Sequence, residues 1–111
     1  MVPIQEKRKP HYDLKRLKQL IREEKFIITK NADHSAFSLG FSRHEIIEIV
    51  LGLTNADFYK SMTTYHNHKI WQDVYKPQVE SQDEKLELYM KLQESADQKC
   101  IVISFKKSEA F

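Results

Sequence analysis

Residues that interrupt or crosslink a chain are scarce in this sequence. Its 111 residues include two glycines, three prolines and one cysteine. With so few residues that break helices and strands, most of the chain is free to form regular structure. The lone Cys100 excludes an internal disulfide, which favours a reducing compartment.

Long apolar runs are scarce as well. No run approaches the roughly 20 consecutive apolar residues that a membrane-spanning helix needs. The opening residues MVPIQEKRKPHYD also lack the apolar centre of a signal peptide. We therefore expect a cytoplasmic protein. The length predicts a single domain over residues 1–111, with flexible tails at residues 1–5 and 108–111.

Charge is unevenly distributed along the chain. Residues 1–30 carry nine lysines and arginines against four acids, whereas residues 79–99 carry three lysines against six acids. The basic end can attract a polyanion or an acidic partner protein. The same charges are equally consistent with solvated helix surfaces, because the isoelectric point of about 8.6 lies below the value of about 9 that typifies nucleic-acid-binding domains.

Two helices have clear signals in the N-terminal half. In YDLKRLKQLIREE, leucine and isoleucine recur at helical spacing after Asp13, which is placed to cap the first turn. SRHEIIEIVLGL opens with a capping box from Ser42 to Glu45, ahead of several isoleucines. Both segments are therefore predicted to be helical, each with one apolar face.

The segments around these helices are predicted from weaker patterns. KFIITK, residues 25–30, is short and β-branched, as strands are. Residues 31–41 are expected to form a loop. In NADFYKSMTTY, residues 55–65, Phe58 and Met62 stand one helical turn apart, which predicts a third short helix that carries Lys60.

The C-terminal half alternates in the manner of strands. Strands are predicted near residues 70–76, 86–92 and 100–106, and the short connectors between them predict an antiparallel meander. In residues 86–92 the leucines and the methionine face the helices, so Tyr89 points the other way. In residues 100–106 the alternation places Ile101, Ile103 and Phe105 on one face. Helices on such a sheet make an α+β domain.

Several long words in the sequence are more specific than any of these patterns. DFYKSMTTY, IWQDVYKP, LYMKL and IVISFKK, with the N-terminal EKRKPHYDLKRLK, resemble the motility quorum-sensing regulator family of toxins over residues 6–107. The resemblance implies a RelE-like α+β fold with helices packed on one antiparallel sheet. It also implies a type II toxin that acts with an antitoxin partner, typically a zinc-containing, DNA-binding protein. The implied activity is cleavage of messenger RNA at short GC-containing sequences, without a ribosome and without a metal or other cofactor.

The same resemblance implies which residues are catalytic. The matching positions are Lys60, Gln72, Tyr89 and Lys106. RNA is cut without a metal when its own 2′-hydroxyl attacks the adjacent phosphate, which yields a 2′,3′-cyclic phosphate and a free 5′-hydroxyl. Such a site must stabilise negative charge, move protons and orient the reacting groups. We assign charge stabilisation to the two lysines, proton transfer chiefly to the tyrosine, and orientation to the glutamine.

Substrate-binding residues are expected beside the catalytic ones. They are Tyr59, Tyr75 and Lys76, and the two tyrosines are of a type that stacks on unpaired bases. Tyrosines in strands also serve as packing, so both roles stay open at this point.

Two alternatives to this mechanism follow from the residues themselves. His66 and His68 stand two apart at the entry to a strand, so they share a face there and offer either two metal ligands or an acid–base pair. In addition, the same fold can serve as a non-catalytic module that binds RNA or protein, because a fold does not determine an activity.

Overall fold

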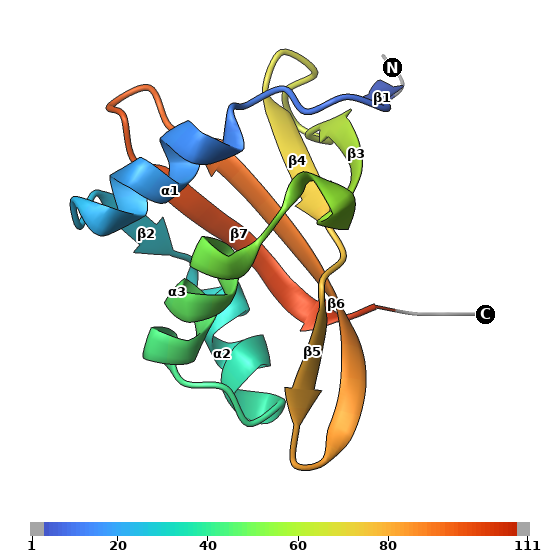
Figure 1. Cartoon of the computed structure of the whole chain (residues 1–111). Helices are drawn as coiled ribbons and strands as arrows, with labels where there is room; N and C mark the ends of the chain where they lie inside the picture. Colours follow the sequence, from blue (N-terminus) through green and yellow to red (C-terminus); the bar gives the residue numbers. More distant parts are fainter. Residues whose placement is uncertain (1–3, 109–111) are drawn as a thin grey trace.

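A computed structural model describes residues 4–108, which form three helices packed on one face of a seven-stranded sheet (Figure 1). The helices are α1 (Leu14–Arg22), α2 (Lys30–Ser38) and α3 (Arg43–Gly52). The strands are β1 (Glu6–Lys7), β2 (Phe26–Ile28), β3 (Phe58–Thr63), β4 (Trp71–Tyr75), β5 (Gln78–Ser81), β6 (Glu84–Glu94) and β7 (Cys100–Lys107). The α+β class predicted from the sequence is confirmed.

The sheet is mixed, although most of its pairings are antiparallel. Its strand order is β1-β3-β4-β6-β7-β2, in which only β2 and β7 are parallel. The predicted meander is confirmed as β4, β6 and β7. The sequence did not predict β5, which pairs with the start of β6 in a hairpin that extends beyond the helices (Figure 1). Gln82 and Asp83 form its turn with φ of 52° and 66°, the left-handed conformation that tight hairpin turns require.

The helices cover the apolar face of the central strands. Leu88, Met90 and Leu92 of β6 are fully buried, as are Leu17 and Leu20 of α1. Each side chain of this kind contributes about 1.5–3 kcal/mol when it leaves water. The alternation predicted for residues 86–92 is therefore confirmed. Within residues 4–108 no helix has the length and apolar character to cross a bilayer.

The predicted helix caps are present. The Asp13 side chain accepts a hydrogen bond from the Lys15 N–H at the start of α1. At the start of α3, the Ser42 hydroxyl accepts from the Glu45 N–H, and the Glu45 carboxylate accepts from the Ser42 N–H. These contacts satisfy N–H groups that a helix cannot pair internally.

The prediction of a loop at residues 31–41 is wrong, because residues 30–38 form α2. The Thr29 hydroxyl caps this helix by accepting a hydrogen bond from the Ala32 N–H. The buried residues of α2 are only Ala32 and Ala36. Since alanine is a weak marker of an apolar face, the helical period is hard to detect in the sequence.

The prediction of a helix at residues 55–65 is wrong as well. Only Asn55–Asp57 are helical, as one 3-10 turn, and the chain then runs as β3 between β1 and β4. Pairing on both edges supplies the backbone hydrogen bonds that a helix would have made. Lys60 consequently lies in a strand rather than on a helix.

A β-bulge changes which residues of β7 face the core. Lys91 of β6 is opposite Ser104, whereas the next residue, Leu92, is opposite Val102, so Ile103 is an extra residue. The predicted common face of Ile101, Ile103 and Phe105 is therefore wrong. The buried residues of β7 are Cys100, Val102 and Phe105.

A buried carboxylate attaches the N-terminal segment to the sheet. Asp73 on β4 is fully buried. It accepts hydrogen bonds from the backbone N–H of His11 at 3.1 Å and of Tyr12 at 2.9 Å. The Tyr12 hydroxyl donates to the Trp71 carbonyl at 2.7 Å. These contacts direct the chain between β1 and α1 across the sheet.

The expected flexible tails fall only partly within the described residues. Gln5 exchanges backbone and side-chain hydrogen bonds with Thr63, and the Ser108 N–H donates to the Glu87 carbonyl at 2.8 Å. These described ends are thus tied to β3 and β6. Residues 1–3 and 109–111 lie outside the described part of the chain.

Asp73→Ala should destabilise the fold by on the order of 3 kcal/mol, since it removes a charged acceptor and leaves two backbone N–H groups without a partner. Urea unfolding followed by circular dichroism measures this change. Asp33→Ala is the matched control, because Asp33 makes a surface ion pair of 3.7 Å with Arg43, and such pairs contribute less than about 1 kcal/mol. Equal unfolding midpoints for the two variants would refute the role given to Asp73.

Candidate active site

The sheet face that points away from the helices, here called the open face, brings the implied catalytic residues together. Lys60 on β3 is paired with Val74 on β4, and Val74 with Lys91 on β6. Tyr89 on β6 is paired with Lys106 on β7. Paired residues project to the same face of a sheet, and on β6 this face alternates with the buried apolar one. Three of the four implied residues therefore meet here.

Gln72 is the fourth, and a neighbouring strand holds its side chain. It stands two residues before Val74 on β4, so it shares the open face. Its side chain is mostly buried, and its amide nitrogen donates to the Gln93 Oε1 on β6 at 2.9 Å. One amide donor is committed to this bond, which fixes the side chain in place for contact with a ligand.

Lys60 has a carboxylate partner from the N-terminal segment. Its Nζ lies 2.5 Å from the Glu6 Oε2, and its side chain is only 17% exposed. The pairing of β1 with β3 positions Glu6. The hydrogen bond from Lys60 is the main reason that the pKa of Glu6 is lowered.

Tyr89 lies at the centre of the cluster as a neutral phenol. Its ring centroid is 5.1 Å from the Lys106 Nζ and 5.8 Å from the Lys91 Nζ. Burial raises the pKa of Tyr89, against the opposing effect of the Lys60 charge. The hydroxyl therefore stays protonated at neutral pH and can donate a proton or a hydrogen bond. In the structure it lies 3.9 Å from the Met62 sulfur.

Lys91 is a residue of this cluster that the sequence analysis missed. It is half-buried between Lys60 and Lys106. Burial lowers the pKa of Lys91, and the positive charges of Lys106 and Lys60 lower it further. The segment LYMKL indicates its position, because Lys91 stands two residues after Tyr89 and so lies on the same face of the strand.

Cations gather around Tyr59 at one edge of the open face. The Lys76 Nζ lies 3.9 Å from the ring centroid of Tyr59, the Arg8 Cζ 5.3 Å and the Lys60 Nζ 5.4 Å. The Tyr59 residue is 38% exposed. An exposed ring among cations offers both a stacking surface and countercharge to a nucleotide.

Tyr75 is not part of the site, in contrast to the expectation that it binds substrate. It is fully buried on the helix side of the sheet, where its ring packs edge-to-face against Phe58 at 5.6 Å. Burial raises the pKa of Tyr75. Among the described residues, its hydroxyl has no hydrogen-bond partner. The role of this ring is packing.

The two histidines lie apart from the cluster. His66 and His68 are exposed in the connection between β3 and β4, before β4 begins. The expectation that they share one face of a strand is therefore wrong. His66 packs edge-on against Tyr65. Within residues 4–108, His, Cys, Asp and Glu side chains form no group of three that could hold a metal ion.

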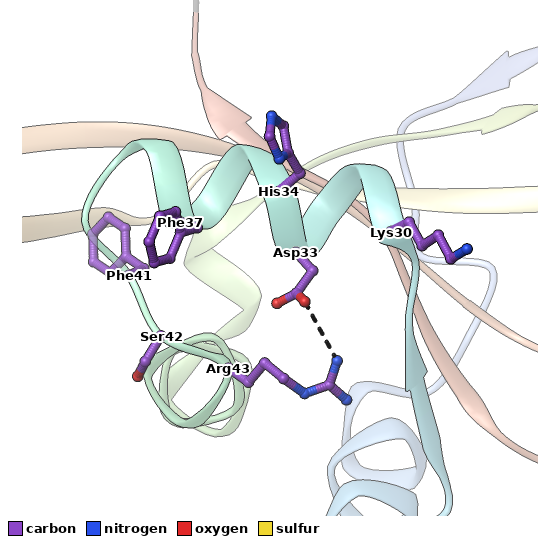
Figure 2. A pocket seen from close by; sticks show the side chains of 7 residues that line it. All are labelled: Lys30, Asp33, His34, Phe37, Phe41, Ser42 and Arg43. Carbon is purple, nitrogen blue, oxygen red and sulfur yellow. Dashed lines mark ion pairs between the residues drawn. The ribbon is translucent and has the colours of Figure 1, made fainter.

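A pocket of about 560 Å³ lies between α2 and the start of α3 (Figure 2). Its lining includes the ion pair of Asp33 and Arg43 and the exposed ring of Phe37. None of its lining residues belongs to the open-face cluster. The candidate chemistry is therefore on the sheet and not in this pocket.

The cluster as a whole suits an anion that gains charge during a reaction. It combines three lysine side chains, a protonated phenol and a fixed amide on one rigid sheet. Ammonium groups stabilise developing negative charge on phosphoryl oxygens, and the phenol can supply a proton. These are the components of phosphodiester cleavage.

Comparison with known proteins identifies the family of the chain. The family described as motility quorum-sensing regulator, toxin of MqsA, matches residues 9–107, a span that includes every strand of the cluster. The mRNA interferase toxin MqsR of Escherichia coli (strain K12) is 38% identical over 101 residues, which are 91% of this chain and 97% of that relative. The resemblance found in the sequence is confirmed, and the chain belongs to the motility quorum-sensing regulator family of toxins.

Proposed function

We propose that this protein is an mRNA interferase, the toxin of a type II toxin–antitoxin system, which cleaves messenger RNA in the cytoplasm and so stops translation and growth. The observation that carries the proposal is the meeting of Lys60, Gln72, Tyr89 and Lys106 on one open sheet face. Family membership and the printed activity of the Escherichia coli relative support it. In this proposal the enzyme acts on free RNA, without the ribosome, at short GC-containing sequences.

The proposed reaction is transesterification within the RNA. The 2′-oxygen of the nucleotide before the cut bonds to phosphorus, and the bond from phosphorus to the 5′-oxygen breaks. The products are a 2′,3′-cyclic phosphate and a free 5′-hydroxyl. The step needs charge stabilisation and two proton transfers, and neither requires a metal.

Each side chain has a role that matches its surroundings. Lys60, positioned by its ion pair with Glu6, and the exposed Lys106 stabilise charge on the phosphoryl oxygens. Tyr89 keeps its proton at neutral pH, so it serves as the acid that protonates the leaving 5′-oxygen. Gln72 orients the nucleotide. Tyr59 and Lys76 hold the adjoining base and phosphate.

Lys60→Ala should slow cleavage by about a hundredfold, because loss of one preorganised cation removes on the order of 3 kcal/mol of transition-state stabilisation. Tyr89→Phe should cost a similar factor and leave the fold intact, since within residues 4–108 the one hydrogen bond of its hydroxyl is the 3.9 Å contact with the Met62 sulfur. The assay follows a 5′-labelled RNA of defined sequence, cut by purified protein in the presence of EDTA.

The histidines provide the matched controls for this assay. His66→Ala and His68→Ala should keep nearly full activity, because both side chains are exposed outside the cluster. Full activity in the Lys60 and Tyr89 variants, with loss in either histidine variant, would establish the histidine mechanism instead. A non-catalytic module would bind the RNA and leave it whole.

The partner in this proposal is an antitoxin that contains zinc and binds DNA. The described basic residues near the N-terminus include Lys15 and Arg22, which are exposed on α1. Attraction between this end and an acidic surface falls as salt rises.

Expression of the chain alone should arrest growth, and expression with the neighbouring small gene should relieve the arrest. Lys15→Glu with Arg22→Glu should weaken the complex of the two proteins by about tenfold at low salt and by less at high salt. Growth curves and calorimetric titration measure these outcomes. Normal growth at high expression, with no binding by the neighbouring gene product, would refute the toxin assignment.

A further inference from the structure

We propose that Lys91 is a further catalytic residue of this site, the general base that removes the proton from the attacking 2′-hydroxyl. The inference rests on the proposed function, because it names a role within the same cleavage reaction. It starts from the position of Lys91 at the centre of the cluster. On one side, Lys91 is opposite Val74 of β4, which is in turn opposite Lys60 of β3. On the other side, Lys91 is opposite Ser104 of β7, which stands two residues before Lys106.

The three lysines of the open face differ in what surrounds their amines. Lys60 has the Glu6 carboxylate at 2.5 Å. Lys106 is exposed to water. Lys91 is half-buried, and within residues 4–108 no carboxylate lies within ion-pair distance of it. Lys91 is therefore the lysine of the cluster that has neither a carboxylate partner nor full contact with water among the described residues.

The groups that face Lys91 either lower its pKa or are uncharged. Lys60 approaches from β3 and Lys106 from β7, and both charges lower the pKa of Lys91 in addition to the effect of burial. Tyr89 on the same strand is a neutral phenol. Glu6 and Tyr59 lie beyond Lys60, and the Glu6 carboxylate is engaged by that lysine. These surroundings therefore favour the neutral amine of Lys91 over its ammonium form.

The pKa values of the two proton-transfer groups are consequently shifted in opposite directions. The pKa of Tyr89 is raised and that of Lys91 is lowered, and a pair of this kind divides naturally into an acid and a base. The neutral amine of Lys91 takes the proton of the 2′-hydroxyl as the 2′-oxygen bonds to phosphorus. The bond to the 5′-oxygen breaks, and that oxygen receives the phenolic proton of Tyr89. Solvent then returns a proton to Tyr89 and removes one from Lys91.

Lys91→Met and Lys91→Arg should both cleave RNA about a hundredfold more slowly than the wild type, within the range typical for loss of a general base. Arginine keeps the positive charge but cannot accept a proton. Lys107→Met is the matched control and should keep full activity, because Lys107 is opposite the buried Leu88 and so belongs to the other face. Activity of Lys91→Arg within about threefold of wild type would show a charge role only and overturn the proposal.

The pH dependence gives an independent readout. Only the neutral amine acts as a base, so wild-type cleavage should rise about tenfold per pH unit below the pKa of Lys91 and level off above it. In Lys91→Ala this rise should be lost, and ethylamine added to the buffer should restore it. A rise unchanged in Lys91→Ala would assign it to another group and overturn the proposal.

A modified RNA separates the base from the acid. Sulfur in place of the 5′-oxygen at the mapped cleavage position leaves without a proton, so this RNA should rescue Tyr89→Phe and not Lys91→Arg. Rescue of Lys91→Arg would make Lys91 the acid and overturn the proposal. Wild-type protein that cuts neither RNA would refute the proposed function itself. Arginine at position 91 keeps a long, positively charged side chain, so Lys91→Arg still tests the proposal if the Met and Ala variants unfold.

Discussion

The mutual influence of closely placed lysine amines is the physical interaction that defines the open face. The charges of Lys106 and Lys60 disfavour a further positive charge on the half-buried Lys91 and so lower its pKa, a repulsion that a sheet has to hold in place. The sheet holds Lys60, Lys91 and Lys106 together despite this repulsion, because the other face of the same strands is buried beneath the helices. Each buried leucine there contributes about 1.5–3 kcal/mol. A bound phosphate would relieve the repulsion, so the cost in the free protein favours binding of an anion.

The N-terminal segment connects the fold to this site. Asp73 fixes the backbone at His11 and Tyr12, and the chain before them runs back along β3 as β1. That path brings Glu6 to Lys60, so one lysine of the cluster has a carboxylate partner, whereas Lys91 has no such partner among the described residues. A carboxylate buried on the other side of the sheet thus supports the arrangement of side chains on the open face.

The sequence predicted what depends on short-range periodicity. The period of two in residues 86–92 placed Tyr89 on the face that points away from the core. The family resemblance implied Lys60, Gln72 and Lys106 as further site residues. The predictions were wrong where pairing with strands distant in the sequence determines the secondary structure or the face of a residue. Pairing with β1 and β4 turns residues 58–63 into a strand, and the extra residue Ile103 reverses the faces of β7. The same period places Lys91 on the face of Tyr89, but the residues that make it distinctive, Lys60 and Lys106, lie on other strands and are not evident from a local pattern.

In the proposed reaction, the RNA's own 2′-hydroxyl attacks the phosphate at the open face. Mass spectrometry of the two fragments from a defined RNA, cut by wild-type protein in EDTA, distinguishes this attack from attack by water. Attack by the 2′-oxygen leaves a 2′,3′-cyclic phosphate on the upstream fragment and a 5′-hydroxyl on the downstream one. An upstream 3′-hydroxyl with a downstream 5′-phosphate would contradict the proposed reaction, because water rather than the 2′-oxygen would then have attacked the phosphate.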